Sequence, residues 1–272
     1  MKNKTITALA ALLLASFSAA EAQTTIAAWD FDTIGTEAVG YNTPAATTGS
    51  GTASVLGMSN SYNNTNSITG ADVLATAGAS TGSGSYAWRI RGNAAAPNGG
   101  NGWSSQAPIG SQGAEFDAST VGFNNIQVSF DVDTTAQAER NLMLEYTING
   151  STWLDATLAS GSSLGTLATG SGANTINGSY VQLGSGWNNQ IESAVLPAAV
   201  NGDAAFGIRI VNASTGADDV NVSGAALNNT SGNWRVDNVV ISGIVATPEP
   251  STLALGGLGA AAIALFRRNQ KA

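Results

Sequence analysis

The chain has 272 residues, of which ten are basic and eighteen acidic, and its formal net charge is −8. It contains neither cysteine nor histidine, which excludes disulfides, Ser-His-Asp and Cys-His catalysis, and the usual zinc ligand sets. Residues 23–246 include no lysine, and their five arginines accompany sixteen acidic residues. This charge balance argues against nucleic acid as a partner. The missing cysteine, histidine and lysine leave carboxylates as the only candidates for catalysis.

The N-terminus has the pattern of a secretory signal peptide over residues 1–22. Lys2 and Lys4 precede an apolar run over residues 6–17, and Ala20-Glu21-Ala22 forms a cleavage site of the A-x-A type. We expect a signal helix that is removed, so that the mature protein begins at Gln23. The length of residues 23–246 favours one all-β ectodomain over two domains.

The ectodomain lacks the 3.6-residue period of helices and alternates between short β-type runs and clusters of Gly, Ser, Thr and Asn. Strands are predicted over residues 26–32, 86–91, 125–133, 142–148, 152–156, 190–196, 205–211 and 234–243, with weaker ones over 53–57 and 71–74. In 125–133 the alternation is strict, which predicts Ile126, Val128, Phe130 and Val132 inside and Asp131 outside. About ten strands predict a two-sheet antiparallel β-sandwich of jelly-roll, concanavalin-like or galactose-binding-like type.

Two local irregularities are predicted within these strands. Asn149-Gly150 is typical of a tight hairpin turn between residues 142–148 and 152–156. In residues 234–243 the alternating apolar residues shift by one position, from Trp234 and Val236 to Val239 and Ile241. This shift predicts a bulge at Asp237-Asn238.

Acidic residues mark the first and last predicted strands, as Trp29-Asp30-Phe31-Asp32 and Arg235-Val236-Asp237-Asn238. The pair resembles the acidic signatures of MAM-type and carbohydrate-binding jelly rolls, in which the first and last strands are often neighbours. The resemblance implies a structural calcium ion held by Asp30, Asp32 and Asp237 with backbone carbonyls. The alternative is that these side chains face solvent, with Asp237 pairing with Arg235 or capping the bulge.

The tryptophans divide into two groups. Trp88, Trp153 and Trp234 lie within predicted strands and follow the alternation of their apolar residues, which favours a place in the core. Trp103 and Trp187 lie among Gly, Asn and Ser, and we take them as the candidates for an exposed platform on which a sugar stacks. Simple anchoring of the loops is the alternative for both.

The segment Glu115-Phe116-Asp117 is similar to the Glu-x-Asp-x-x-Glu strand of laminarinase-like glycosidases, which place two carboxylates on one face. Thr120 occupies the position of the second glutamate, so the motif is incomplete. We therefore assign no catalytic residue and expect a non-enzymatic protein. Asp218-Asp219 is interpreted as a solvated pair in a loop.

The C-terminus combines three features over residues 247–272. Pro248-Glu249-Pro250 favours an exposed, extended peptide. The uncharged residues 251–266 predict a transmembrane helix of about 24 Å, which is short against a bilayer core of about 30 Å. Residues 267–272 are basic, and Arg267 and Arg268 would keep this end in the cytoplasm.

This arrangement resembles the PEP-CTERM sorting signal of Gram-negative bacteria, although Thr247 stands where members often have valine. The resemblance implies processing by exosortase, a membrane-embedded cysteine transpeptidase, after transient anchoring in the inner membrane. The final location would be the cell envelope, the outer surface or an extracellular matrix.

We expect a structural or adhesive biofilm-matrix protein associated with exopolysaccharide. A carbohydrate-binding module is the alternative, and a carboxylate-based glycosidase or lyase is a third, weaker hypothesis.

Overall fold

The computed structural model describes residues 22–31, 43–57, 88–91, 102–156, 176–177, 180–183, 186–229 and 232–246. The predicted signal peptide and the C-terminal signal over 247–272 therefore lie outside the described residues, apart from Ala22 at the end of the former. The described part contains no helix with the length and apolarity of a membrane span.

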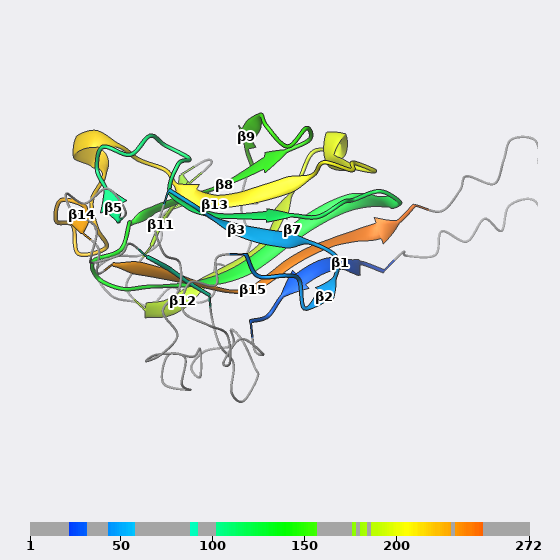
Figure 1. Cartoon of the computed structure of the whole chain (residues 1–272), viewed down its shortest axis with the longest axis horizontal. Coiled ribbons are helices and arrows are strands. Elements are labelled where there is room, and N and C mark those ends of the chain that lie inside the picture. The colour runs from blue at the N-terminus through cyan, green and yellow to red at the C-terminus, as the bar shows by residue number, and fades with distance from the viewer. Residues whose placement is uncertain are drawn as a thin grey trace, which may run out of the picture.

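The described strands form two large antiparallel sheets, as the sequence predicted (Figure 1). The first sheet has the order β12 (Gly186–Val195), β7 (Phe123–Thr134), β15 (Asn233–Val245), β1 (Thr24–Trp29) and β2 (Thr48–Gly49), and β4 (Trp88–Arg91) also pairs with β15. The second has the order β10 (Ile176–Asn177), β11 (Tyr180–Gln182), β8 (Asn141–Thr147), β13 (Gly207–Asn212), β6 (Gly113–Asp117) and β3 (Thr52–Leu56), and β9 (Trp153–Asp155) pairs with β8. The remaining elements are the small β5 (Trp103–Ser104) and β14 (Asn228–Asn229) pair and the 3-10 turns η4 (Ala198–Val200) and η5 (Gly216–Asp218).

The core lies between the two sheets and consists of the side chains that alternate inward along the strands. In β7 the predicted inward residues Ile126, Val128, Phe130 and Val132 are all buried. Aromatic rings join the layers: Phe116 of β6 contacts Trp29 of β1 edge-on, with ring centroids 5.1 Å apart, and also contacts Trp88 of β4 at 5.8 Å. Such pairs contribute about 0.5–1.5 kcal/mol each beyond the burial of their area.

β1 and β15 are neighbours, as expected for the first and last strands. Thr24 lies opposite Gly243 and Trp29 opposite Val239, so both ends of the described ectodomain are at one end of the sandwich (Figure 1). The β5 and β14 pair lies at the opposite end (Figure 1). A segment that follows β15 therefore leaves the domain beside its N-terminus.

The predicted bulge is confirmed at Asp237-Asn238. The pairing of β15 with β7 shifts register between Asp237 and Val240, and Asn238 has a positive φ of 49°. The predicted outward position of Asp131 is wrong, because this residue is 3% exposed. The bulge turns the Asn238 amide toward it, and Asn238 Nδ2 donates to Asp131 Oδ2 at 2.8 Å.

A second aromatic contact closes the end of the sandwich near β5. The rings of Trp103 and Trp234 have centroids 4.6 Å apart, and both side chains are completely buried. Their indole N–H groups donate to Gly232 O at 3.0 Å and to Glu139 O at 2.8 Å. Trp103 is thus part of the core although it lies in a Gly-rich and Asn-rich stretch of sequence.

Trp103→Ala should lower the free energy of unfolding by about 3–5 kcal/mol, because it leaves a large cavity beside Trp234. Leu154, which is 45% exposed, provides a control. Leu154→Ala should change the free energy of unfolding by about 0.5 kcal/mol or less. Denaturant unfolding followed by tryptophan fluorescence measures both. Equal midpoints for the two variants would contradict the burial of Trp103.

Candidate functional site

Polar side chains cross the outer face of the second sheet in one row. Glu115 of β6 lies opposite Arg209 of β13, Arg209 lies opposite Glu145 of β8, and Glu145 lies opposite Asp155 of β9. The residues between them along the strands, such as Phe116 and Ile208, point into the core. We call this surface the Arg209 face and define it by Glu115, Asp117, Glu145, Thr147, Trp153, Asp155 and Arg209.

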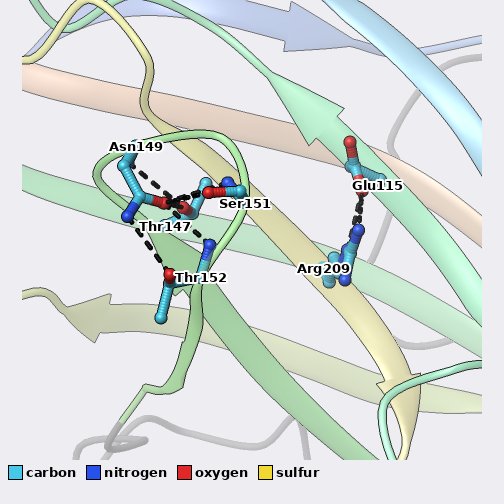
Figure 2. A network of polar contacts seen from close by, with 6 residues as sticks. All are labelled: Glu115, Thr147, Asn149, Ser151, Thr152 and Arg209. Atoms are coloured by element: carbon cyan, nitrogen blue, oxygen red, sulfur yellow. Dashed lines mark hydrogen bonds and ion pairs between the residues drawn. The ribbon is translucent and has the colours of Figure 1, made fainter.

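Arg209 is the centre of this face. Its Nε donates to Glu115 Oε2 at 2.6 Å, and its Nη2 lies 2.6 Å from the same oxygen (Figure 2). The guanidinium carbon lies 3.7 Å from the centroid of the Trp153 ring. The two ion-paired side chains are only 22% and 18% exposed, so solvent screens their attraction less than at an open surface. Arg209 is therefore held by a charge-assisted hydrogen bond and by a cation–π contact.

The turn between β8 and β9 positions Trp153. Asn149 Oδ1 accepts hydrogen bonds from the backbone N–H groups of Ser151 at 2.9 Å and Thr152 at 2.7 Å (Figure 2). Gly150 has a positive φ of 69°. The predicted hairpin is confirmed, but its turn spans residues 148–152 because the Asn149 side chain closes a wider loop than a two-residue turn.

Gly207 allows the neighbouring groups to approach closely. A Cβ atom on Gly207 would lie 2.4 Å from Asp117 Oδ1 and 3.2 Å from the Trp153 ring. Only glycine leaves room for both side chains above β13 at this position. The carboxylate of Asp117 and the ring of Trp153 thus lie on either side of the bare Gly207 backbone.

The carboxylates of this face influence one another. Burial raises the pKa of Asp117 to about 6, and the neighbouring Glu115 adds to the rise while Arg209 opposes it. Burial also raises the pKa of Glu145, with Arg209 opposing and Asp155 adding. A cavity of about 440 Å³ lies beside Glu115 and Asp117 and is also lined by Thr52 and Ser119.

This arrangement suits the binding of a hydroxyl-rich molecule. Its carboxylates accept hydrogen bonds, Arg209 donates them, and Trp153 offers a partly exposed aromatic surface beside them. Four carboxylates accompany one guanidinium, so the face favours a neutral ligand over an anionic one. Thr120, at the position where the glycosidase motif requires a glutamate, is fully buried and donates to Val200 O at 2.5 Å.

The acidic residues proposed for calcium are only partly described. Pairing of β1 with β15 brings Asp30 toward the bulge, whereas Asp32 lies outside the described residues. Asp237 is 1% exposed, and its Oδ1 accepts the backbone N–H of Asn238 at 2.8 Å, which is the capping role given as the alternative. Over the described ranges, no group of three or more His, Cys, Asp and Glu residues is placed to hold a metal ion together. Calcium at Asp30, Asp32 and Asp237 stays a prediction.

The exposed platform predicted for Trp103 is contradicted by its complete burial against Trp234. Trp187 was expected in a loop, but it belongs to β12, and its side chain is outside the described set. The sorting residues Pro248, Glu249, Pro250, Arg267 and Arg268 also lie outside the described residues.

The partly exposed tryptophan of the described sheet face is Trp153, which the sequence had assigned to the core. The alternation Ile208-Arg209-Ile210 did carry a signal, because it places Arg209 on the outer face. No local pattern brought Arg209 and Trp153 together, since the pairing of β13, β8 and β9 decides it.

Asp117→Asn tests the electrostatics of this face. A carboxyl whose pKa rises from 3.8 unfolded to about 6 folded binds more protons in the folded state, so it costs stability as pH rises between these values. The wild type should therefore lose more stability than Asp117→Asn between pH 4 and pH 6. Thermal unfolding across this range measures the difference.

Two further variants sharpen this test. Glu115→Gln removes one cause of the rise, so the pH-dependent loss should move to lower pH. Asp218→Asn, an exposed change on a distant loop, should follow the wild type. Parallel curves for the wild type and Asp117→Asn would show that Asp117 titrates normally.

The chain was also compared with known proteins. No curated protein and no solved structure matches it. Residues 246–268 match the family described as the PEP-CTERM protein-sorting motif, which overlaps the predicted signal over 247–272. The matched segment begins directly after Val245, the last residue of β15. The chain thus carries a PEP-CTERM sorting motif, which indicates an exported protein that exosortase processes and sorts to the cell envelope.

Proposed function

We propose that the chain is a non-enzymatic protein of the outer surface or biofilm matrix and that the Arg209 face binds exopolysaccharide. The observation that carries the proposal is the partly exposed Trp153 ring stacked on Arg209 and flanked by carboxylates on a partly exposed sheet face. Aromatic rings beside hydrogen-bonding groups suit sugars, which have apolar C–H faces and hydroxyl edges.

The charge of the face defines the substrate class. Glu115, Asp117, Glu145 and Asp155 surround Arg209, and the ectodomain as a whole is acidic and free of lysine. Polysaccharides rich in uronate or sulfate would be repelled. A neutral, hydroxyl-rich glycan is the ligand that this surface favours.

The position of the ends supports an adhesive role. β15 ends at Val245, the sorting motif begins at residue 246, and the N-terminal start of β1 lies at the same end (Figure 1). While the C-terminus is anchored, the domain is held by this end alone. The outer face of the second sheet then lies along the flank of the sandwich, where a long glycan can pass.

Trp153→Ala should weaken retention on a neutral polysaccharide gel at least about tenfold, because it removes the stacking ring together with its cation–π contact to Arg209. Leu154→Ala, on the same strand but exposed beside it, is the matched control and should migrate as the wild type. Affinity electrophoresis with neutral and uronate-rich polysaccharides makes the comparison. Unchanged retention of Trp153→Ala on every gel that retards the wild type would exclude this face.

Replacing Pro248-Glu249-Pro250 by three alanines should abolish C-terminal processing in the producing cell, because the matched sorting motif is lost. Gln270→Ala lies beyond the matched residues 246–268 and is the control. The intact mass of the exported protein reports the result. The same shortened mass in the wild type and the triple variant would rule out processing at this motif.

A further inference from the structure

A buried polar cluster lies apart from the Arg209 face. Glu139 precedes β8, Asn141 begins β8, Ser214 follows β13, and Asp219 follows η5. These four side chains belong to residues that are 0%, 5%, 8% and 2% exposed, respectively. Two acidic residues at such depth are unusual in a protein, since buried charges are normally paired or coordinate metals.

Ser214 connects the members of the cluster. Its Oγ lies 3.2 Å from Glu139 Oε1 and 3.1 Å from Asp219 Oδ1, and it accepts a hydrogen bond from Asn141 Nδ2 at 2.8 Å. A hydroxyl carries one hydrogen, so Ser214 can donate to only one of the two carboxylates at a time. The protein therefore brings together more acceptors than it supplies donors.

Three oxygens of the cluster receive no hydrogen bond from an N–H group or a hydroxyl group of the protein. They are Glu139 Oε2, Asp219 Oδ2 and Asn141 Oδ1, and all three are buried. The amide oxygen of Asn141 is an observation independent of the acidic pair, because Asn141 directs its Nδ2 to Ser214 and to Asp218 O at 3.2 Å. Buried oxygens without donors indicate a missing electrophilic partner.

Arginine does not provide that partner. Arg140, next to Glu139 in sequence, donates from Nη2 to Gln182 Oε1 at 3.3 Å. Among the side chains that the structure describes, no arginine forms an ion pair with Glu139 or Asp219. A proton shared by Glu139 and Asp219 would balance one of the two charges, but it would leave Asn141 Oδ1 without a partner. A bound cation would balance both carboxylates and contact this amide oxygen as well.

A cavity borders the cluster on the side of Asn141 and Ser214. It has a volume of about 400 Å³, and Asn141 and Ser214 form part of its wall together with Gln182 and Asp218. Asn141 and Ser214 thus belong both to the cluster and to the cavity wall. The volume accommodates a small ion with several water molecules.

We propose that Glu139, Asn141, Ser214 and Asp219 form a binding site for a divalent cation of the calcium type. Every side-chain ligand is an oxygen, which suits a hard cation, and two carboxylates balance its charge. Calcium accepts an irregular shell of six to eight oxygens, so water and backbone carbonyls can complete it, whereas magnesium demands a near-ideal octahedron. This site is separate from the one predicted at Asp30, Asp32 and Asp237.

Calorimetric titration of the full chain, purified in detergent and freed of metal with a chelator, tests the proposal. Calcium chloride should give a saturable signal, and calcium at about 100 times its Kd should raise Tm by about 5–10 °C. Magnesium chloride should give a weaker response. No heat and no change in Tm with calcium would overturn the proposal.

Matched variants assign any binding to this cluster. The backbone nitrogen of Asn141 donates to Glu139 Oε1 at 2.6 Å. Glu139→Gln keeps an oxygen that accepts this hydrogen bond but removes one negative charge. Both Glu139→Gln and Asp219→Asn should weaken calcium binding at least about tenfold. Asp155→Asn removes an exposed charge on the Arg209 face, away from this cluster, and should bind as the wild type. Equal affinity of all four proteins would place the ion elsewhere and refute this site.

Terbium luminescence supplies a second measurement that does not depend on stability. Terbium occupies oxygen-rich calcium sites, and Trp234, whose indole donates to Glu139 O at 2.8 Å, lies close enough to sensitise it. Emission should rise with terbium, fall when calcium competes, and be lost in Asp219→Asn. Emission that persists undiminished in Asp219→Asn would contradict the assignment.

Discussion

The contact of Trp29 and Trp88 with Phe116 is the interaction on which the two-sheet arrangement depends. It joins β1 and β4 of the first sheet to β6 of the second, with ring centroids 5.1 and 5.8 Å from Phe116. The chain has no cysteine, so no disulfide can support the packing of the sheets. Aromatic and aliphatic burial between the layers must therefore stabilise the domain.

This packing also determines what the outer face presents. Once Phe116 points inward, the alternation of a strand directs Glu115 and Asp117 outward, and the same applies to Arg209 between Ile208 and Ile210. Antiparallel pairing of β6, β13, β8 and β9 then aligns these outward residues in a row. The core and the proposed glycan surface are thus two consequences of one register.

Two groups of acidic residues in the ectodomain have different environments. On the Arg209 face they are partly exposed and lie around one guanidinium, so they remain available to a ligand. At Glu139 and Asp219 they are buried, and burial together with their proximity raises the pKa of Glu139 well above its usual range. An acidic composition alone does not separate these cases, because solvation and nearby charges decide how a carboxylate behaves.

The sequence by itself determined the features that are encoded in contiguous residues. The sorting motif is a short linear pattern, the inward residues of β7 follow from alternation, and the phase change at Asp237-Asn238 marks the bulge. Tertiary structure decided the rest, because it brings together distant segments. Asp219 was expected to be solvated but is buried beside Glu139. Trp103 was expected on an exposed loop but is buried, whereas Trp153 was expected in the core but is partly exposed. Burial depends on which strands and loops pack against a residue, and that information is not present in the residues next to it.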